Sequence, residues 1–122
     1  MCGGPLGDDG AFRYSYLQSI YRAPVEESLE GRGLRIAIRA ARSADRRAVE
    51  YFRWDGPIRQ DERGFVQDAP PNEVEQLVIR ISPEYTQRVS ADGWSCDLPA
   101  RFGDAVVTVR VRVLPALAGA LR

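Results

Sequence analysis

The sequence predicts a mainly β domain, a single antiparallel β-sandwich or partly open barrel of about five to seven strands with one or two short helices. The first observation is the segment 105–114, in which valines alternate with Thr108, Arg110 and Arg112. A period of two is typical of a strand with one buried face, so we expect a central or near-central strand here. The second observation is the same alternation in residues 34–40. The third is that glycine, proline and aspartate break the chain between such segments.

The length of the chain favours one domain. A chain of 122 residues buries about two-thirds of the surface that its unfolded form exposes, so it needs neither a disulfide nor a metal for stability. We expect a single β-rich domain over residues 11–115 and a C-terminal tail over residues 116–122. Residues 1–10 contain several glycines, a proline and two aspartates without an apolar period, which predicts a flexible N-terminal tail.

Four segments make up the N-terminal half of the expected domain. Residues 11–21 are rich in aromatic side chains and favour a strand, although Phe12, Tyr16 and Ile20 also have helical spacing. Residues 23–30 fit one helical turn or a second short strand, and their acidic side chains slightly favour the helix. Residues 34–40 fit a strand, and residues 48–54 favour a strand that forms a hairpin with it. A helix over residues 43–52 is the competing interpretation.

The C-terminal half begins with a long polar stretch. Asp55-Gly56-Pro57 breaks the chain, and we expect residues 55–72 to form one long loop, which is a candidate for binding. Residues 73–81 return to strand alternation, residues 83–89 fit a short helix, and residues 94–96 fit a short edge strand. The alternative fold is an α+β arrangement, an antiparallel sheet covered by one helix drawn from residues 11–29 or 43–52.

Missing residue types exclude several kinds of active site. The chain has no histidine, and all 17 of its basic residues are arginine. Ser-His-Asp and Cys-His nucleophiles, Schiff-base lysines and the lysine of a phosphate-binding P-loop are therefore excluded. The usual zinc sites need more histidine or cysteine than Cys2 and Cys96 provide, and we expect no metal and no cofactor.

The cysteines and the apolar pattern bear on cellular location. Because most of the chain separates the two cysteines, we expect Cys96 to be a small, partly buried residue beside Trp94 rather than the disulfide partner of Cys2. The first residues lack the basic and apolar pattern of a secretory signal, and no run reaches the roughly 18 apolar residues of a membrane span. We therefore expect a cytoplasmic protein that does not enter a membrane.

Arginines form the main candidate binding set, because five of them lie opposite the apolar face of their predicted strands: Arg35, Arg39, Arg80, Arg110 and Arg112. In one interpretation they form a solvated face on which acids such as Glu73 and Glu75 pair with them. In the other they dock an acidic protein surface, phosphate or a nucleic-acid backbone, with Tyr14 and Tyr16 as stacking groups.

The expected 55–72 loop adds Arg63 and Phe65 to the candidate residues. With Gly64 they match the first residues of the RNP1 signature of RNA-recognition motifs, but Val66 to Asp68 depart from its continuation. A formal net charge of zero also disfavours nucleic acid as the partner. Nucleic-acid or phosphate binding is therefore the third hypothesis for function.

The leading functional hypothesis is a non-enzymatic protein-binding or assembly module, a small subunit or a regulator of a larger complex. It would dock through the arginine-lined face or the 55–72 loop. The partner would be another protein, for example one with an acidic surface, or a second copy of the same chain. The alternative is a small-ligand-binding protein or a carboxylate-based enzyme, with an aromatic pocket lined by Tyr14, Tyr16, Tyr51, Trp54 and Trp94.

Overall fold

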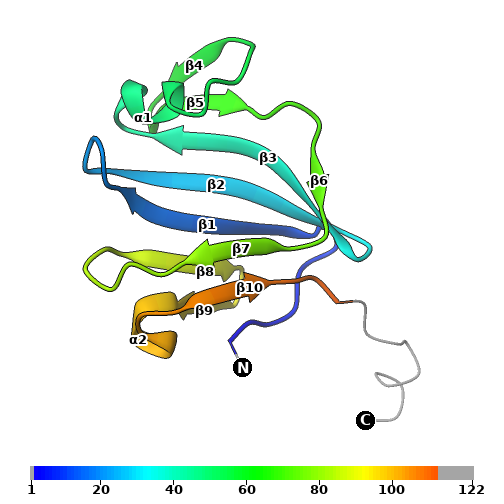
Figure 1. Ribbon diagram of the computed structural model, residues 1–122. Coiled ribbons are helices and arrows are strands. Elements are labelled where there is room, and N and C mark those ends of the chain that lie inside the picture. Colours follow the sequence, from blue (N-terminus) through cyan, green and yellow to red (C-terminus); the bar gives the residue numbers. More distant parts are fainter. Residues whose placement is uncertain (1, 113–122) are drawn as a thin grey trace, which may run out of the picture.

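The computed structural model describes residues 2–112 and shows a mainly β protein with antiparallel sheets and two short helices (Figure 1). The predicted fold class is confirmed. The strands are β1 (Ala11–Gln18), β2 (Ala23–Arg32), β3 (Arg35–Ser43), β4 (Ile58–Asp61), β5 (Gly64–Asp68), β6 (Glu73–Val74), β7 (Leu77–Arg80), β8 (Gln87–Ala91), β9 (Trp94–Asp97) and β10 (Val106–Val109). The helices are α1 (Arg46–Glu50) and α2 (Leu98–Phe102).

One large sheet and one small sheet contain all of these strands. The large sheet has the order β4-β5-β3-β2-β1-β8-β9, with β6 paired to β3, and the small sheet consists of β7 and β10. Every pairing is antiparallel. The predicted central strand at 105–114 is wrong in position, because β8 occupies the place beside β1, and within residues 2–112 β10 pairs only with β7. Residues 113–122, which include the expected C-terminal tail, lie outside the described residues.

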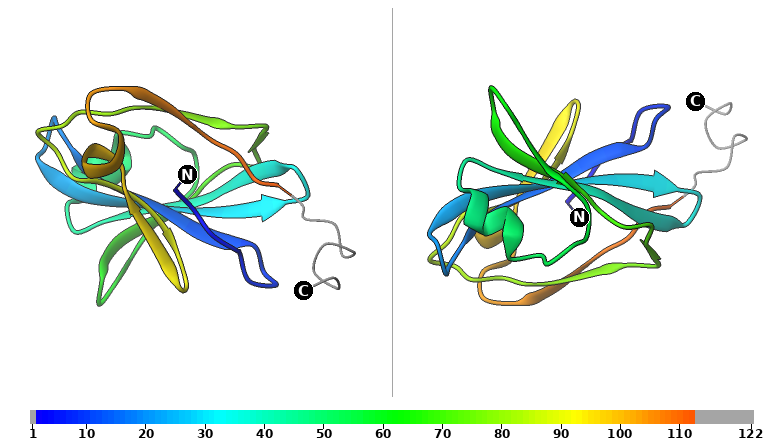
Figure 2. Two further views of the ribbon diagram at one scale, coloured as in Figure 1. Left: turned by 90° about the horizontal axis from the view of Figure 1, so that it is seen from below. Right: turned by 90° about the horizontal axis from the view of Figure 1, so that it is seen from above.

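The inner face of the large sheet carries the core. The register pairs Phe12 with Leu29 and Tyr16 with Val25, so their side chains share one face. Around Phe12 and Leu29, a cluster that includes Ile36, Ile79 and other apolar side chains lies beneath β7, β10 and α2. A second cluster around Val25 and Tyr16 lies beneath α1 and Phe52. Figure 2 shows β7, β10 and α1 on the same side of the large sheet.

The valine alternation in the 105–114 segment predicts its buried face correctly. Val107, Val109 and Val111 pack against the first core cluster, whereas Val106 and Thr108 are exposed. The segment thus uses its apolar side to cover the large sheet rather than to join it. This arrangement explains why the same pattern fits both a central strand and a strand of a covering layer.

Helix α1 replaces the strand expected over residues 48–54, so the competing helical interpretation of residues 43–52 is closer to the structure. Asp45 caps it by accepting a hydrogen bond from the Arg47 amide at 2.9 Å. Ala48 and Val49 are fully buried, and this packing compensates for a helix of only five residues. A helix this short is not the covering helix of the alternative α+β fold.

Three other segments differ from what was expected or favoured. Of the two interpretations of residues 23–30, the strand is correct and the slightly favoured helical turn is wrong, because these residues pair with β1 along its whole length. Residues 55–72 contain the β4–β5 hairpin, which extends the large sheet beyond β3. The expected helix at 83–89 is a turn followed by β8, which pairs with β1 on one side and β9 on the other. In each case cross-strand pairing overrides a local helix or loop preference.

The N-terminal segment (residues 2–10) lies against the domain instead of extending from it as a tail. A disulfide joins Cys2 to Cys96, with 5.8 Å between their Cα atoms. The Trp94 indole donates a hydrogen bond to the Pro5 carbonyl at 2.8 Å, and Leu6 packs on the core. The expectation of unpaired cysteines is therefore wrong: the strand order brings β9 beside the start of the chain, and sequence separation does not reveal this. Within residues 2–112, no helix is long and apolar enough to cross a membrane.

Candidate protein-binding surface

The arginines of β3 have acidic partners. Arg35 lies 3.5 Å from Glu73 and 3.8 Å from Glu75, and Arg39 lies 3.6 Å from Glu30. Glu73 and Glu75 are the two acids expected to pair in the solvated interpretation of the arginine face. Exposed pairs of this kind contribute a few tenths of a kcal/mol each, about 1 kcal/mol at most. This geometry favours a solvated face around β3.

The other three arginines of the predicted set do not lie on the large sheet. Arg80 is on β7, 3.8 Å from Asp104, while Arg110 and Arg112 follow β10. The Arg110 guanidinium donates a hydrogen bond to the side-chain oxygen of Gln76 at 2.9 Å. The five arginines are thus divided between two sheets, and they do not form one continuous docking face.

Arg63 and Phe65 belong to the β4–β5 hairpin. The Arg63 guanidinium lies 3.4 Å from Glu26 on the solvent side of the large sheet, and Phe65 is half-buried beneath the Arg46 guanidinium. The neighbouring Arg42–Asp61 pair is bidentate, with bonds of 2.6 and 2.8 Å. These bonds hold the pKa of the Asp61 carboxyl at about 2. The hairpin tip is therefore part of the same network of exposed ion pairs.

Tyr14 and Tyr16 face the core and do not form an exposed stacking platform. Their rings lie 4.7 Å apart, and the Gln87 side-chain amide donates a hydrogen bond to the Tyr14 hydroxyl at 3.0 Å. The Tyr16 hydroxyl is hydrogen-bonded to Glu27, which the register places beside both tyrosines at the seam between the two core clusters. Burial raises the pKa of the Glu27 carboxyl, and the hydrogen bond from Tyr16 opposes that rise.

The aromatic pocket of the enzyme hypothesis is not assembled. Tyr51 is 55% exposed. Trp94 contacts the N-terminal segment beside β9, at one edge of the large sheet. Trp54 precedes the β4–β5 hairpin at the opposite edge, and its ring stacks on Phe52 at 4.6 Å. Glu27 is the one carboxylate that the described strands place on the inner face beside Tyr14 and Tyr16. A two-carboxylate mechanism would need a second acid at that position.

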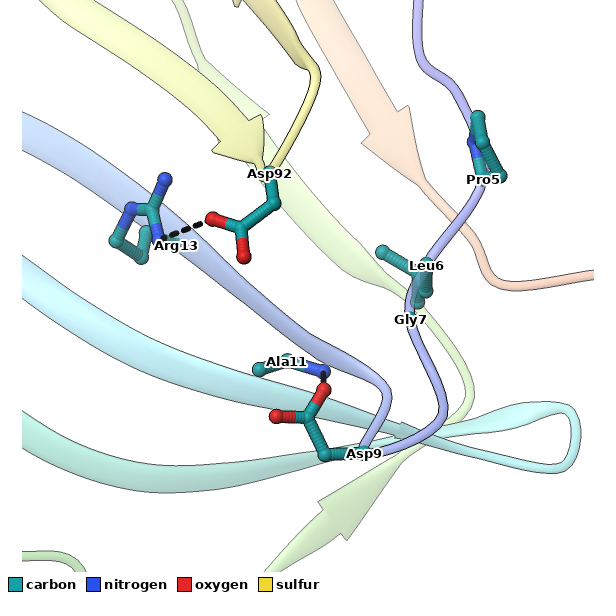
Figure 3. Close-up of a pocket in the computed structure, with 7 residues that line it drawn as sticks. All are labelled: Pro5, Leu6, Gly7, Asp9, Ala11, Arg13 and Asp92. Atoms are coloured by element: carbon teal, nitrogen blue, oxygen red, sulfur yellow. Dashed lines mark hydrogen bonds and ion pairs between the residues drawn. The ribbon is translucent and has the colours of Figure 1, made fainter.

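Two open hollows lie on the surface. The first, of about 280 Å³, is bordered by the N-terminal segment and β1 (Figure 3). Its charged groups are already engaged, since Arg13 faces Asp92 at 4.0 Å and Asp9 accepts a hydrogen bond from the Ala11 amide at 3.0 Å. The second, of about 810 Å³, lies over β3 beside Arg39 and Glu73, whose ion pairs are given above. Within residues 2–112, no three or more Cys, Asp or Glu side chains are grouped to hold a metal ion.

A surface that the sequence analysis missed lies where the β1–β2 turn meets the end of α1. We call it the tyrosine–arginine surface, and its members are Ile20, Tyr21, Arg22, Tyr51 and Arg53. The Tyr21 and Tyr51 rings meet edge to face, with centroids 6.5 Å apart, and the Arg47 guanidinium covers the Tyr21 ring at 4.6 Å. Ile20 is 57% exposed. Ile20 and Tyr51 are therefore open to solvent at this end of the molecule, whereas Tyr21 is partly buried against the second core cluster.

Both arginines of this surface have an unusual backbone. Arg22 has φ of 53° and Arg53 has φ of 56°, the two non-glycine residues with positive φ in the described part of the chain. The Arg53 amide bonds to the Glu50 carbonyl at 3.0 Å and ends α1, a place where glycine is the usual residue. Within residues 2–112 neither guanidinium has an ion pair or a hydrogen-bond partner. The sequence shows that aromatic and arginine residues occur at 20–22 and 51–53. It does not show that Arg22 and Arg53 have a left-handed backbone or that the two segments lie close together.

Comparison of the chain with protein-family models, with curated proteins and with solved structures gives no match.

Proposed function

We propose that the protein is a non-enzymatic protein-binding module that uses the tyrosine–arginine surface to dock a partner with acidic side chains next to an apolar one. The observation that carries this proposal is the pair of unpartnered arginines, Arg22 and Arg53, both held at positive φ beside exposed Tyr51. Tyrosine and arginine are the residue types that contribute most to binding at protein interfaces.

Backbone strain strengthens the choice of this surface over the arginines of β3. An arginine at positive φ costs about 1 kcal/mol relative to glycine, so glycine would serve the fold better at both positions. Residues whose strained backbone lowers stability are found preferentially at functional sites. The β3 arginines, in contrast, have a structural partner each.

The chemistry of the surface defines its partner. Two free guanidinium groups favour carboxylates, which they bind in bidentate geometry, and the exposed Tyr51 ring and Ile20 favour an aliphatic or aromatic side chain packed against them. A nucleic-acid backbone is less favourable, because the formal net charge of the whole chain is zero.

A peptide-display selection against the full-length protein tests this proposal. We expect the enriched peptides to combine aspartate or glutamate with one large apolar residue. Binding of a selected synthetic peptide should weaken at least about tenfold in the double variant Arg22→Gly with Arg53→Gly, since two charge-assisted hydrogen bonds are lost. Glycine suits the positive φ at both sites, so this variant should keep its fold.

The matched control removes two arginines from the large sheet. Arg35→Ala with Arg39→Ala changes the net charge by the same amount, and it should leave the peptide affinity within about twofold. If the control weakens binding as much as the glycine variant, general electrostatics explains the affinity. If the control alone weakens binding, the docking site is the arginine face of β3, and the tyrosine–arginine surface is refuted.

The cytoplasmic location expected from the sequence remains a prediction. A disulfide between Cys2 and Cys96 is typical of chains that fold in an oxidising compartment, and it therefore speaks against that location. Alkylation of the protein in freshly broken cells decides the question: two alkylated cysteines support a reducing compartment, and none supports an oxidising one.

A further inference from the structure

Among residues 2–112, nothing pairs with one edge of strand β10. It pairs with β7 on its other side, and the Ile81 amide donates to the Ala105 carbonyl at 2.8 Å. Because the backbone groups of successive residues point to opposite sides of a strand, residues 105, 107 and 109 face β7 and residues 106 and 108 face outward. No residue between 2 and 112 forms a backbone hydrogen bond to the outward groups of Val106 or Thr108.

Apart from its short length of four residues, β10 has few of the usual protections of edge strands. The sequence Val106–Val109 contains neither proline, glycine nor a charged residue, and all of its side chains are β-branched. Val106 is 56% exposed, and Val78 on β7 is 62% exposed on the same outer side of the small sheet. Exposed edges of this composition readily pair with another strand.

The charges at the two ends of β10 identify the strand that fits. Asp104 precedes β10, and Arg110 and Arg112 follow it, all three exposed. When β10 pairs antiparallel with a copy of itself, the acidic end of each strand lies beside the basic end of the other. A parallel copy would instead place like charges together.

The possible registers of two antiparallel β10 strands also place opposite charges side by side. The outward residues have even numbers, so self-pairing must bring even residues opposite even ones. Of the two such registers nearest to full overlap, one pairs residue 106 with residue 108 and places Asp104 opposite Arg110. The other pairs residue 108 with itself and places Asp104 opposite Arg112. Each register forms two acid–base pairs, one at each end.

We infer that β10 is a self-association edge, through which two copies of the chain join antiparallel about a two-fold axis. The two small sheets then form one four-stranded sheet, β7-β10-β10-β7, whose outer face carries Val78, Val106 and Thr108 of both copies. An isologous contact of this kind closes after two copies, which limits assembly to a dimer. This surface is separate from the tyrosine–arginine surface, and it does not depend on the proposed function.

Sedimentation equilibrium of the full-length protein, from about 1 μM to about 1 mM, measures the self-association directly. We expect the mass to rise from the 13.6 kDa of one chain toward twice that value. Thr108→Pro removes an outward amide that has no backbone partner among residues 2–112, so the variant should fold, as judged by circular dichroism, and stay monomeric.

Charge-reversal variants test the pairing without a backbone change. Asp104→Arg alone places arginine against arginine, and Arg110→Asp with Arg112→Asp alone places acid against acid, so each variant should be monomeric. An equimolar mixture of the two is complementary at both ends, and it should form heterodimers with about the affinity of the native protein. Recovery of the dimer in the mixture is expected only where the acidic end of one chain lies beside the basic end of the other.

Each outcome decides the inference. A native protein that remains monomeric at the highest concentration refutes it. A dimer that persists in Thr108→Pro or in either charge variant places the contact on another face. Loss of dimer in the separate variants without recovery in the mixture contradicts the antiparallel register. Recovery in the mixture supports a pair of β10 edges, and masses beyond the dimer would contradict a closed two-fold contact.

Discussion

Removal of the Cys2–Cys96 disulfide should cost a large share of the stability of the protein. The bond links residues 94 positions apart and therefore constrains most of the unfolded chain. A cross-link that closes a loop of this length lowers the entropy of the unfolded state by an amount worth roughly 4.7 kcal/mol at 25 °C. That value is an upper estimate, since measured losses for native disulfides are usually about 2–4 kcal/mol. The whole domain is stabilised by about 5–15 kcal/mol.

The structural consequence should be local. Reduction releases Cys2, while the Pro5 contact to the Trp94 indole and the packing of Leu6 remain as weak attachments. We therefore expect residues 2–10 to exchange hydrogen by local opening once the bond is reduced. The core amides of β1 and β2 should still exchange only through global unfolding, and faster in proportion to the loss of stability.

Urea unfolding followed by circular dichroism, with and without a reductant, measures the effect. We expect a decrease of about 2–4 kcal/mol in the free energy of unfolding on reduction. The double variant Cys2→Ser with Cys96→Ser is the control, because it should match the reduced protein and should not respond to the reductant. Equal midpoints for the oxidised and reduced protein, or two free thiols in the denatured, unreduced protein, would refute this reasoning.

Three further predictions concern single side chains. Because burial raises the pKa of the Glu27 carboxyl, the native state favours its protonated form. Glu27 therefore lowers the stability of the protein as the pH rises from its unfolded pKa of about 4.3 through its higher folded pKa. Glu27→Gln should raise the melting temperature at pH 7, and a gain that does not shrink toward pH 3 would contradict this. Arg22→Gly and Arg53→Gly should each leave stability unchanged or raise it by up to about 1 kcal/mol in urea titrations, and a clear loss would show that these arginines support the fold. Gln67 donates to the carbonyls of residues 54 and 56 at 2.9 and 3.0 Å, so Gln67→Leu should cost about 1–3 kcal/mol and increase hydrogen exchange at residues 54–57; wild-type stability would disprove the anchoring role.

Strand positions that alternate strictly could be predicted from the sequence. Residues 11–18 and 35–43 are strands as expected, and the valines at 107, 109 and 111 face the core as expected. In each segment, apolar side chains recur at every second position because one face of the strand is buried. The β4–β5 hairpin and strand β2 could not be predicted so well. Their segments are polar or acidic, since one face of the large sheet is solvent-exposed and bears ion pairs such as Arg42–Asp61.

The candidate site was less accessible to prediction. The sequence shows the arginines of β3 and offers Glu73 and Glu75 as their partners in one of two interpretations. It does not show the Arg39–Glu30 contact or decide between the interpretations, because both depend on strand register. It gives no sign of the conformation of Arg22 or of Arg53, which falls within the strand expected over residues 48–54, since a left-handed backbone leaves no mark in composition. The disulfide was missed for a similar reason: Cys2 meets Cys96 only once β9 has joined the large sheet beyond β8.

The most direct test of the proposed function is a nuclear magnetic resonance titration of the full-length protein with a display-selected acidic peptide. We predict that the largest amide shift changes fall in residues 20–22 and 51–53, and that they disappear in the double variant Arg22→Gly with Arg53→Gly. Shift changes centred on Arg35 and Arg39, or changes that persist in the glycine variant, would contradict docking at the tyrosine–arginine surface.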